Sequence, residues 1–250
     1  MRLIDTDNLE LYEFSEEQIP FGRFAVISHR WTNDEVTFKE YRRGLKKDST
    51  GYQKIINSCS LAKSRNLEYV WIDTCCIDKR SSAELSEAIN SMFRWYQRSA
   101  ECYVHLPDVS LVSLGPDRRA PNLLVGSDWF TRGWTLQELL APSKVLFFDE
   151  GWFPIGARSD DDMASTISQI TGIQTYDLNQ FSHLRASVAR KMSWASKRKT
   201  TRPEDLAYSL LGLFDVNMPL LYGEGSAKAF MRLQLEIIRK TADKSIFAWE

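Results

Sequence analysis

One carboxylate, Glu138, lies among leucines and tryptophans in the stretch WFTRGWTLQELLAP, which ends at Pro142. The segment from Thr135 to Glu138 matches a capping box, in which the glutamate would only satisfy a backbone N–H group. A helix capped at Thr135 would keep only about five residues before the proline, too few to be stable alone. If the helix instead begins near Asp128, the helix dipole disfavours an acid in its last turns by about 0.3–1 kcal/mol. The spacing alone leaves Glu138 open between a surface acid and a carboxylate that performs chemistry.

Polar and aromatic side chains close two of the strands that the sequence predicts. The apolar runs RFAVISH, over residues 23–29, and EYVWID, over residues 68–73, are typical of buried strands. The residues at the carboxyl ends of these runs are Ser28, His29, Arg30, Trp31 and Asp73. In a parallel sheet these ends meet at one edge, where ligands bind. The same residues also fit a turn with a surface arginine and a packed tryptophan, and Asp73 could equally cap the loop that follows.

Other signatures of chemistry are weak or absent. The four cysteines form no CxxC pair and the chain has three histidines, so the spacing of a zinc site is absent and we expect no metal. Three of the cysteines lie in apolar elements and are expected to be buried free thiols, namely Cys59, Cys75 and Cys102. The adjacent pair Cys75 and Cys76 could alternatively ligate a metal or react. The glycine pair in YGEGSAKAF, from Tyr222 to Phe230, lacks the spacing of a phosphate-binding P-loop. No GxSxG, HExxH or GxGxxG motif occurs.

The elements that must position these residues alternate between strands and helices in the first half of the chain. Two further strands are predicted over residues 101–106 and 144–149, and segments with helical periodicity lie between the strands. This alternation predicts an α/β fold with a mostly parallel sheet flanked by helices.

The second half of the chain is predicted to be mainly helical. Its sequence includes a capping box from Thr201 to Glu204, and the tail SIFAWE is strand-like. We expect one domain over residues 1–250, with an α/β core at about 20–150 and a helical extension at about 151–250 packed on it. Because the tail ends abruptly, we expect the chain to be the N-terminal part of a longer protein.

The charge of the chain gives no electrostatic case for an anionic partner. Its 32 basic and 33 acidic residues give a formal net charge of -1, which favours neither nucleic acid nor an anionic membrane as a partner. No apolar run is long enough to span a bilayer, and the first residues lack the basic and apolar regions of a signal peptide. We therefore expect a cytoplasmic protein that binds neither nucleic acid nor membranes.

Five motifs together resemble the fungal heterokaryon incompatibility (HET) domain. In chain order they are FAVISHRW, YVWIDTCCIDK, SEAINSMFRWYQRSAECYVHL, WFTRGWTLQEL and DLAYSLLGLFDVNMPLLYGEG. The resemblance extends over essentially the whole chain. It implies a fungal protein that acts in non-self recognition and regulated cell death. It also implies that nucleotide-binding and repeat receptor domains are fused to the chain or are its partners.

A more distant resemblance links these motifs to Toll/interleukin-1 receptor (TIR) domains, which are flavodoxin-like and many of which cleave NAD. The segment from Ser28 to Arg30 is similar to the Ser-Phe-Arg end of a TIR strand, and Asp73 ends a similar Ile-Asp pair. GWTLQEL resembles the Trp-Cys-x-x-Glu-Leu helix of TIR domains, with Thr135 in place of the cysteine. The catalytic glutamate of the family falls on Glu138.

The resemblance implies that NAD is the substrate and that no further cofactor is needed. The nicotinamide of NAD is a cationic leaving group, so one carboxylate in a partly desolvated site can stabilise the developing oxocarbenium ion. Glu138 would be this catalytic carboxylate, with Trp31 and Trp134 as apolar walls. Arg30 would bind the pyrophosphate, and Asp73 would orient a ribose hydroxyl. The implied substrate-binding set is completed by Ser28 and His29.

A second hypothesis belongs to another functional class. Many TIR domains are adaptors that signal by homotypic assembly, so this chain could equally be a non-catalytic scaffold that triggers cell death by self-association. TIR enzymes generally also need assembly, so the two hypotheses can combine. The motifs do not decide between them, and substitution of Glu138 separates them.

Overall fold

The sheet contains the strands that the alternation predicts and extends beyond them. The computed structural model describes residues 1–113, 120–183 and 185–248. These residues form a seven-stranded sheet in the order β2-β1-β4-β3-β5-β6-β7. The strands are β1 (Arg2–Asp5), β2 (Leu11–Glu13), β3 (Phe24–His29), β4 (Tyr69–Trp71), β5 (Glu101–His105), β6 (Val145–Phe148) and β7 (Pro154–Ala157). The four central strands are parallel, and β1, β2 and β7 add antiparallel edges.

The central strands explain where a site can form. Numbered in chain order, β3, β4, β5 and β6 are central strands 1 to 4. In the sheet they lie in the order β4-β3-β5-β6, that is 2-1-3-4. This is the flavodoxin-like order, in which ligands bind beyond the carboxyl ends of the strands at the point where the strand order reverses. β3 ends at His29 and β4 ends two residues before Asp73. The predicted edge of polar residues therefore exists.

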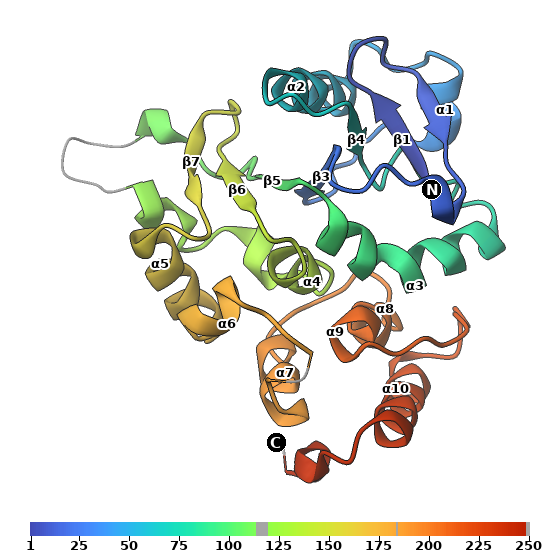
Figure 1. Ribbon diagram of the computed structural model, residues 1–250, viewed down its shortest axis with the longest axis vertical. Helices are drawn as coiled ribbons and strands as arrows, with labels where there is room; N and C mark the ends of the chain where they lie inside the picture. Colours follow the sequence, from blue (N-terminus) through green and yellow to red (C-terminus); the bar gives the residue numbers. More distant parts are fainter. Residues whose placement is uncertain (114–119, 184, 249–250) are drawn as a thin grey trace.

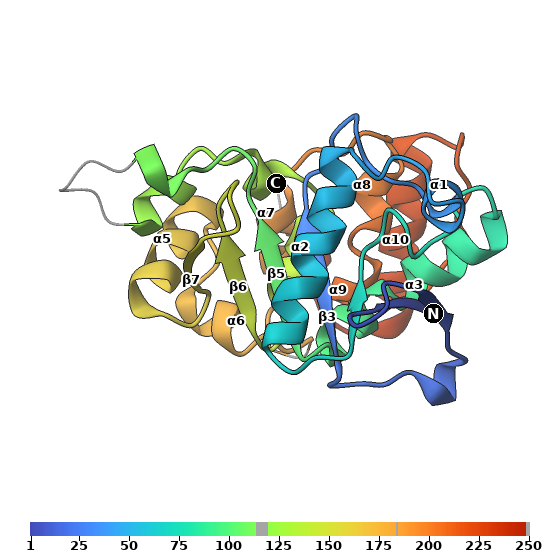
Figure 2. The ribbon, with the colours of Figure 1, turned by 90° about the horizontal axis from the view of Figure 1, so that it is seen from above.

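Helices cover both faces of this sheet (Figure 1). α2 lies on one face and packs on β3 and β4 (Figure 2), whereas α3 and α4 lie on the opposite face. The helices are α1 (Phe38–Arg42), α2 (Thr50–Ser64), α3 (Ser82–Arg98), α4 (Thr135–Leu140), α5 (Asp161–Thr171), α6 (Thr175–Asn179), α7 (Val188–Ala195), α8 (Asp205–Tyr208), α9 (Leu211–Phe214) and α10 (Ser226–Lys240). Within the described part of the chain, no helix has the length and apolar character needed to cross a bilayer.

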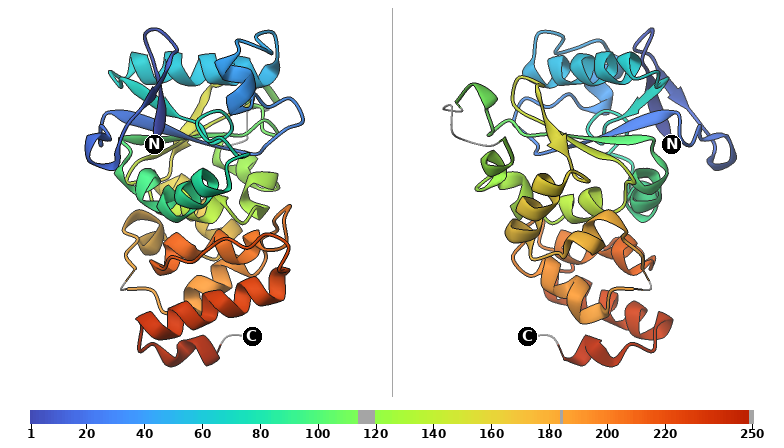
Figure 3. Two further views of the ribbon diagram at one scale, coloured as in Figure 1. Left: turned by 90° about the vertical axis from the view of Figure 1, so that its right-hand side faces the viewer. Right: turned by 60° about the vertical axis from the view of Figure 1, so that its left-hand side comes forward.

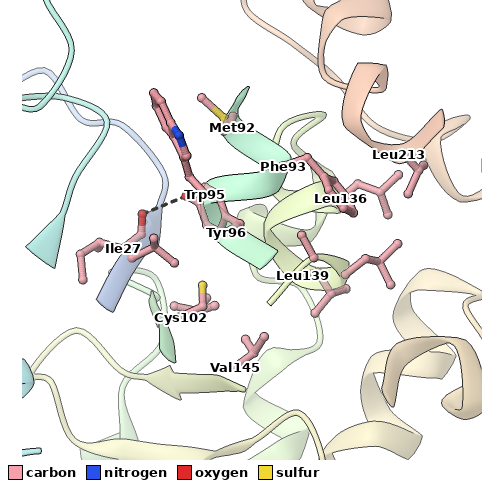
Figure 4. Packing of buried hydrophobic residues seen from close by; sticks show 14 of the residues in the cluster. Ile27, Met92, Phe93, Trp95, Tyr96, Cys102, Leu136, Leu139, Val145 and Leu213 are labelled. Atoms are coloured by element: carbon pink, nitrogen blue, oxygen red, sulfur yellow. Dashed lines mark hydrogen bonds between the residues drawn. The ribbon is translucent and has the colours of Figure 1, made fainter. Parts of the chain in front are cut away.

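The last helices form a further layer, farther from the sheet than α3 and α4 (Figure 3). α9 packs on α3 and α6 packs on α4. Figure 4 shows Phe93 of α3 and Leu136 of α4 beside Leu213 of α9, and all three side chains are buried. α9 lies so close to α3 that a Cβ atom on Gly212 would overlap the Phe93 side chain, so only glycine fits there. The extension is thus packed directly on the α/β core.

Two local predictions about the extension were wrong. The expected capping box does not form, since the Glu204 carboxylate instead accepts the N–H groups of Gly223 at 2.9 Å and Gly225 at 3.0 Å. The tail that was expected to be a strand contains a 3-10 turn, η5 (Lys244–Phe247), while residues 249 and 250 lie outside the described residues. In both places a tertiary contact or a local turn overrides the short sequence pattern. Cys59, Cys75 and Cys102 are buried and free, as predicted, and so is Cys76.

Candidate active site

A cavity of about 220 Å³ lies beyond the carboxyl ends of β3 and β4. Three parts of the chain form its polar wall. The sheet edge contributes His29, Trp31, Asp73 and Lys79, the segment before and within α4 contributes Arg132, Trp134, Thr135 and Glu138, and the extension contributes Thr201, Arg202, Asp205 and Tyr222. The apolar floor comes largely from α3, with Leu85, Ile89, Met92 and Tyr96. Five of the seven residues proposed from the sequence thus line one cavity.

The segment that carries Glu138 folds differently from both structural alternatives considered for it. It forms a 3-10 turn, η4 (Asp128–Thr131), and then the short helix α4, so no continuous helix begins near Asp128. The Thr135 hydroxyl donates to the carbonyl oxygens of Trp129 at 2.7 Å and Arg132 at 2.9 Å, so it caps no N–H group. All six residues of α4 are buried. Tertiary packing, rather than length, stabilises this helix, and Glu138 is neither a cap nor a surface acid.

Glu138 is held from behind by a buried hydroxyl. The residue is 8% exposed, and the Ser28 hydroxyl donates to Oε2 at 2.5 Å. Trp129 Nε1 in turn donates to Ser28 Oγ at 2.8 Å, which fixes the direction of that hydroxyl. Burial raises the pKa of Glu138 to about 8, against the hydrogen bond from Ser28, which lowers it. The result is a desolvated carboxyl group on the cavity wall that gains and loses its proton near neutral pH.

His29, at the end of β3, is an uncharged neighbour in the same cavity. Burial is the main reason that its pKa is lowered, and the Lys54 ammonium lowers it further. The Glu35 carboxylate approaches to 3.5 Å of Nε2 but is bonded to Lys54 at 2.6 Å, and neither ring nitrogen of His29 has a hydrogen-bond partner among the described residues. A buried imidazole without a partner is costly, so a bound ligand that supplied one would be favoured.

Trp31 and Asp73 form a connected group at the mouth of the cavity. Trp31 Nε1 donates to Asp73 Oδ2 at 2.9 Å, and Lys79 Nζ donates to the same oxygen at 3.3 Å. The Lys79 ammonium also lies 3.2 Å from the centre of the Trp31 ring, in a cation–π contact. Trp31 remains 43% exposed. Asp73 therefore orients the tryptophan and the lysine of the mouth.

Two of the residues singled out from the sequence do not line the cavity. Ser28 is fully buried behind Glu138. Arg30 is exposed and is paired with Asp128 of η4. The arginines that do line the cavity are Arg132 and Arg202. Ser28 therefore holds Glu138 rather than facing the cavity.

Sequence reasoning missed the wall that the extension contributes. Asp205, at the start of α8, accepts hydrogen bonds from Trp134 Nε1 at 3.2 Å and from the Tyr222 hydroxyl at 3.0 Å. Burial raises its pKa. Both residues belong to motifs quoted from the sequence, Asp205 to DLAYS and Tyr222 to YGEG. A single acid at the start of an apolar helical segment gives no pattern that marks it as part of a site. The glycines of YGEG bind the Glu204 carboxylate, so an internal anion occupies this loop.

Comparison with known proteins identifies the family to which the chain is similar. Residues 24–122 match the family model described as Heterokaryon incompatibility protein (HET). Over 245 residues the chain is 42% identical to the Vegetative incompatibility protein HET-E-1 of Podospora anserina, an alignment that covers 95% of this chain. The chain carries a HET domain. The alignment covers 18% of the relative, so the chain spans less than a fifth of that protein's length.

The other comparisons add little about the HET domain. Residues 228–250 match a second family model, described as a Domain of unknown function (DUF8212), which begins within α10. No solved structure matches the chain. The segment that matches the HET model contains the sheet edge of the cavity, from His29 to Lys79, whereas Glu138 and Asp205 lie beyond its last residue.

The helical extension also fixes the segment that carries Glu138. Arg198, which is 7% exposed, donates through Nη1 to the Arg132 carbonyl oxygen at 2.8 Å and to Thr135 Oγ1 at 2.9 Å. The Gly133 N–H donates to the Lys199 carbonyl oxygen at 2.9 Å. A Cβ atom on Gly133 would overlap the Thr200 side chain, so this close approach requires glycine. The position of Glu138 therefore depends on residues that lie 60 or more positions away in the sequence.

Proposed function

We propose that this HET domain hydrolyses the bond between nicotinamide and ribose in NAD, with Glu138 as the catalytic carboxylate. The observation that carries the proposal is the buried carboxyl group of Glu138 on a cavity wall, held from behind by Ser28. The cavity volume of about 220 Å³ lies below the ~300–1,000 Å³ of a typical small-molecule site. It therefore suits the nicotinamide riboside end of the dinucleotide rather than the whole molecule.

The proposed reaction needs a negative charge and a proton acceptor. When the C1′–N bond breaks, its electron pair neutralises the nicotinamide ring, and positive charge develops on the ribose. The Glu138 carboxylate stabilises that charge. A water molecule then attacks C1′, and its proton passes to a base of suitable pKa, for which Glu138, at about 8, is well placed. The products are nicotinamide, ADP-ribose and one proton.

Ionisation of Glu138 is coupled to substrate binding in this mechanism. In the free protein, burial favours the neutral acid at neutral pH. A bound nicotinamide ring carries a positive charge, and an opposite charge nearby favours the carboxylate. Binding of the cationic substrate thus favours ionisation of the Glu138 carboxyl group. Trp134 and Trp31 offer aromatic walls to the ring, and the unpartnered nitrogens of His29 offer a hydrogen bond to a ribose hydroxyl or to the carboxamide.

We further propose that this reaction makes the domain a cell-death effector in vegetative incompatibility, in the cytoplasm of a fungus. The name of the Podospora anserina relative supports this role, and the TIR-like motifs around Ser28, Asp73 and Glu138 support NAD as the substrate. Depletion of NAD or release of ADP-ribose would be the toxic event. Self-association and fused nucleotide-binding or repeat domains would control it.

The decisive experiment compares the wild type with Glu138→Gln, which keeps the shape of the side chain and deletes its charge. We expect nicotinamide release from NAD to fall by about 10²–10³-fold, the usual loss when one electrostatic stabiliser of a transition state is removed. Asp128→Asn is the matched control, since Asp128 precedes α4 in the chain but is an exposed partner of Arg30. The proposal fails if the folded wild type, tested over a range of concentrations, releases no nicotinamide.

A non-catalytic scaffold is the second candidate, and one surface favours it. Met231, Leu235 and Ile238 recur at helical spacing on α10 and are 54%, 45% and 44% exposed. An exposed apolar stripe of this kind is typical of an interaction surface. Under this alternative, Glu138→Gln would leave both assembly and toxicity in fungal cells unchanged. Loss of toxicity with assembly intact would instead support catalysis.

A further inference from the structure

A second cavity, of about 180 Å³, adjoins the one that contains Glu138. The two cavities share Trp31, Ile77 and Lys79, so they meet at the cation–π pair of the mouth. Lys39 and Thr74 line only the second cavity. A ligand too long for the first cavity could therefore extend past Trp31 into the second cavity and remain in contact with the protein along its length.

Thr74 gives the second cavity a polar group that lacks a partner. The residue is 4% exposed, and its hydroxyl has no hydrogen-bond partner among the residues that the structure describes. Buried hydroxyl groups are nearly always hydrogen-bonded, and an exception calls for an explanation. A ligand oxygen in the cavity would supply the missing acceptor.

The charges around the second cavity favour an anion. Its two carboxylates are already neutralised, Glu35 by Lys54 at 2.6 Å and Asp78 by Arg80 at 2.6 Å. Lys39 is exposed, and no carboxylate of the described residues forms an ion pair with it. Lys79 reaches Asp73 only at 3.3 Å, at the boundary between the two cavities. The Lys39 ammonium, the Lys79 ammonium that is shared with Asp73, and the Thr74 hydroxyl thus offer donors to the oxygens of a phosphate group.

We propose that the second cavity binds the pyrophosphate of a nucleoside diphosphate, namely that of the ADP half of NAD, with the adenosine extending beyond the cavity. This assignment rests on the proposed function for the identity of the whole ligand, whereas the preference for a diphosphate rests on Lys39, Thr74 and Lys79. The nicotinamide riboside end lies beside Glu138, and the pyrophosphate passes Lys79 at the shared boundary. The Thr74 hydroxyl and the Lys39 ammonium donate to phosphate oxygens.

Binding of ADP, measured by calorimetry, tests the site without requiring catalysis. We expect wild-type protein to bind ADP, and Thr74→Val and Lys39→Met each to weaken binding by about tenfold, as for loss of a hydrogen bond to a charged group. Thr74→Ser, which keeps the hydroxyl, should retain binding. Lys63→Met is the matched lysine control, since Lys63 pairs with Asp7 and lines neither cavity. Failure of wild-type protein to bind ADP, or unchanged binding in Thr74→Val and Lys39→Met, would overturn the assignment.

Kinetics separates this site from the proposed reaction. Nicotinamide riboside contains the scissile bond but lacks both phosphates and the adenosine, so Lys39→Met should raise KM for NAD about tenfold and leave KM for the riboside unchanged. An equal effect on both substrates would contradict the assignment. If ADP binds and the variants weaken it, but NAD is not cleaved, then the nucleotide site stands and the proposed reaction falls.

Discussion

Two carboxyl groups on the wall of the same cavity, Glu138 and Asp205, are held in opposite ways. Burial raises the pKa of both. Asp205 accepts hydrogen bonds from the Trp134 indole and the Tyr222 hydroxyl, so its oxygens tie the extension to the segment before α4. Glu138 is bonded by the Ser28 hydroxyl from the buried side. The comparison indicates that Asp205 has a structural task, while Glu138 keeps acceptor capacity for a ligand. Environment, rather than residue type, separates their roles.

The largest expected effect is a loss of stability as pH rises from about 4.5 to about 8. Between the ordinary pKa of 4.5 and the folded value of about 8, the folded state keeps a proton on Glu138 that the unfolded chain has lost. The free energy of unfolding should therefore fall as pH rises through this window, by an amount on the order of 5 kcal/mol. Glu138→Gln should remove this fall and be more stable than the wild type at about pH 9. Denaturant titrations near both ends of the window measure this loss of stability. An identical pH dependence in the wild type and in Glu138→Gln would show that folding does not raise the pKa of Glu138.

Substitution of Asp205 should lower the free energy of unfolding, whereas substitution of Glu138 should raise it at about pH 9. Asp205→Ala leaves the Trp134 and Tyr222 donors without their acceptor and should lower the free energy of unfolding by about 1–3 kcal/mol. Asp205→Asn should recover most of this loss, because its oxygen can accept from Trp134 and the Tyr222 hydroxyl can accept from its amide. Thermal unfolding of the two variants measures the difference. A gain of stability in Asp205→Ala would remove the contrast with Glu138.

The smallest expected effect concerns the hydroxyl behind Glu138. Ser28→Ala removes a hydrogen bond that favours the charged carboxylate, so the pKa of Glu138 should rise by about one further unit. If the ionised group is required, kcat/KM at neutral pH should fall about tenfold and recover as pH rises. Ser58→Ala is the control, since Ser58 is an equally buried serine whose hydroxyl donates to a backbone carbonyl in α2. A loss of rate that alkaline pH does not restore would assign Ser28 to folding alone.

The part of the cavity that lies at the sheet edge could be predicted from the sequence. β-branched runs identify strands, and alternation with helices makes them parallel, so His29, Trp31 and Asp73 had to meet at one edge. Local pattern could not place Arg30, because whether an exposed arginine faces a cavity or the neighbouring Asp128 depends on the loop that contains Asp128. It also could not find Asp205 or Tyr222, since they reach the cavity only when the extension packs on α3 and α4.

The sequence by itself determined the α/β class, the family and the choice of Glu138 as the carboxylate to examine. These properties follow from periodicity and from motifs that are contiguous in the chain. Only the tertiary structure decided that Glu138 is buried, that Ser28 stands behind it and that the extension contributes Asp205. The pKa of a carboxyl group depends on desolvation and on donors within a few ångströms, and the groups that supply both here come from positions as far apart as Ser28 and Arg198.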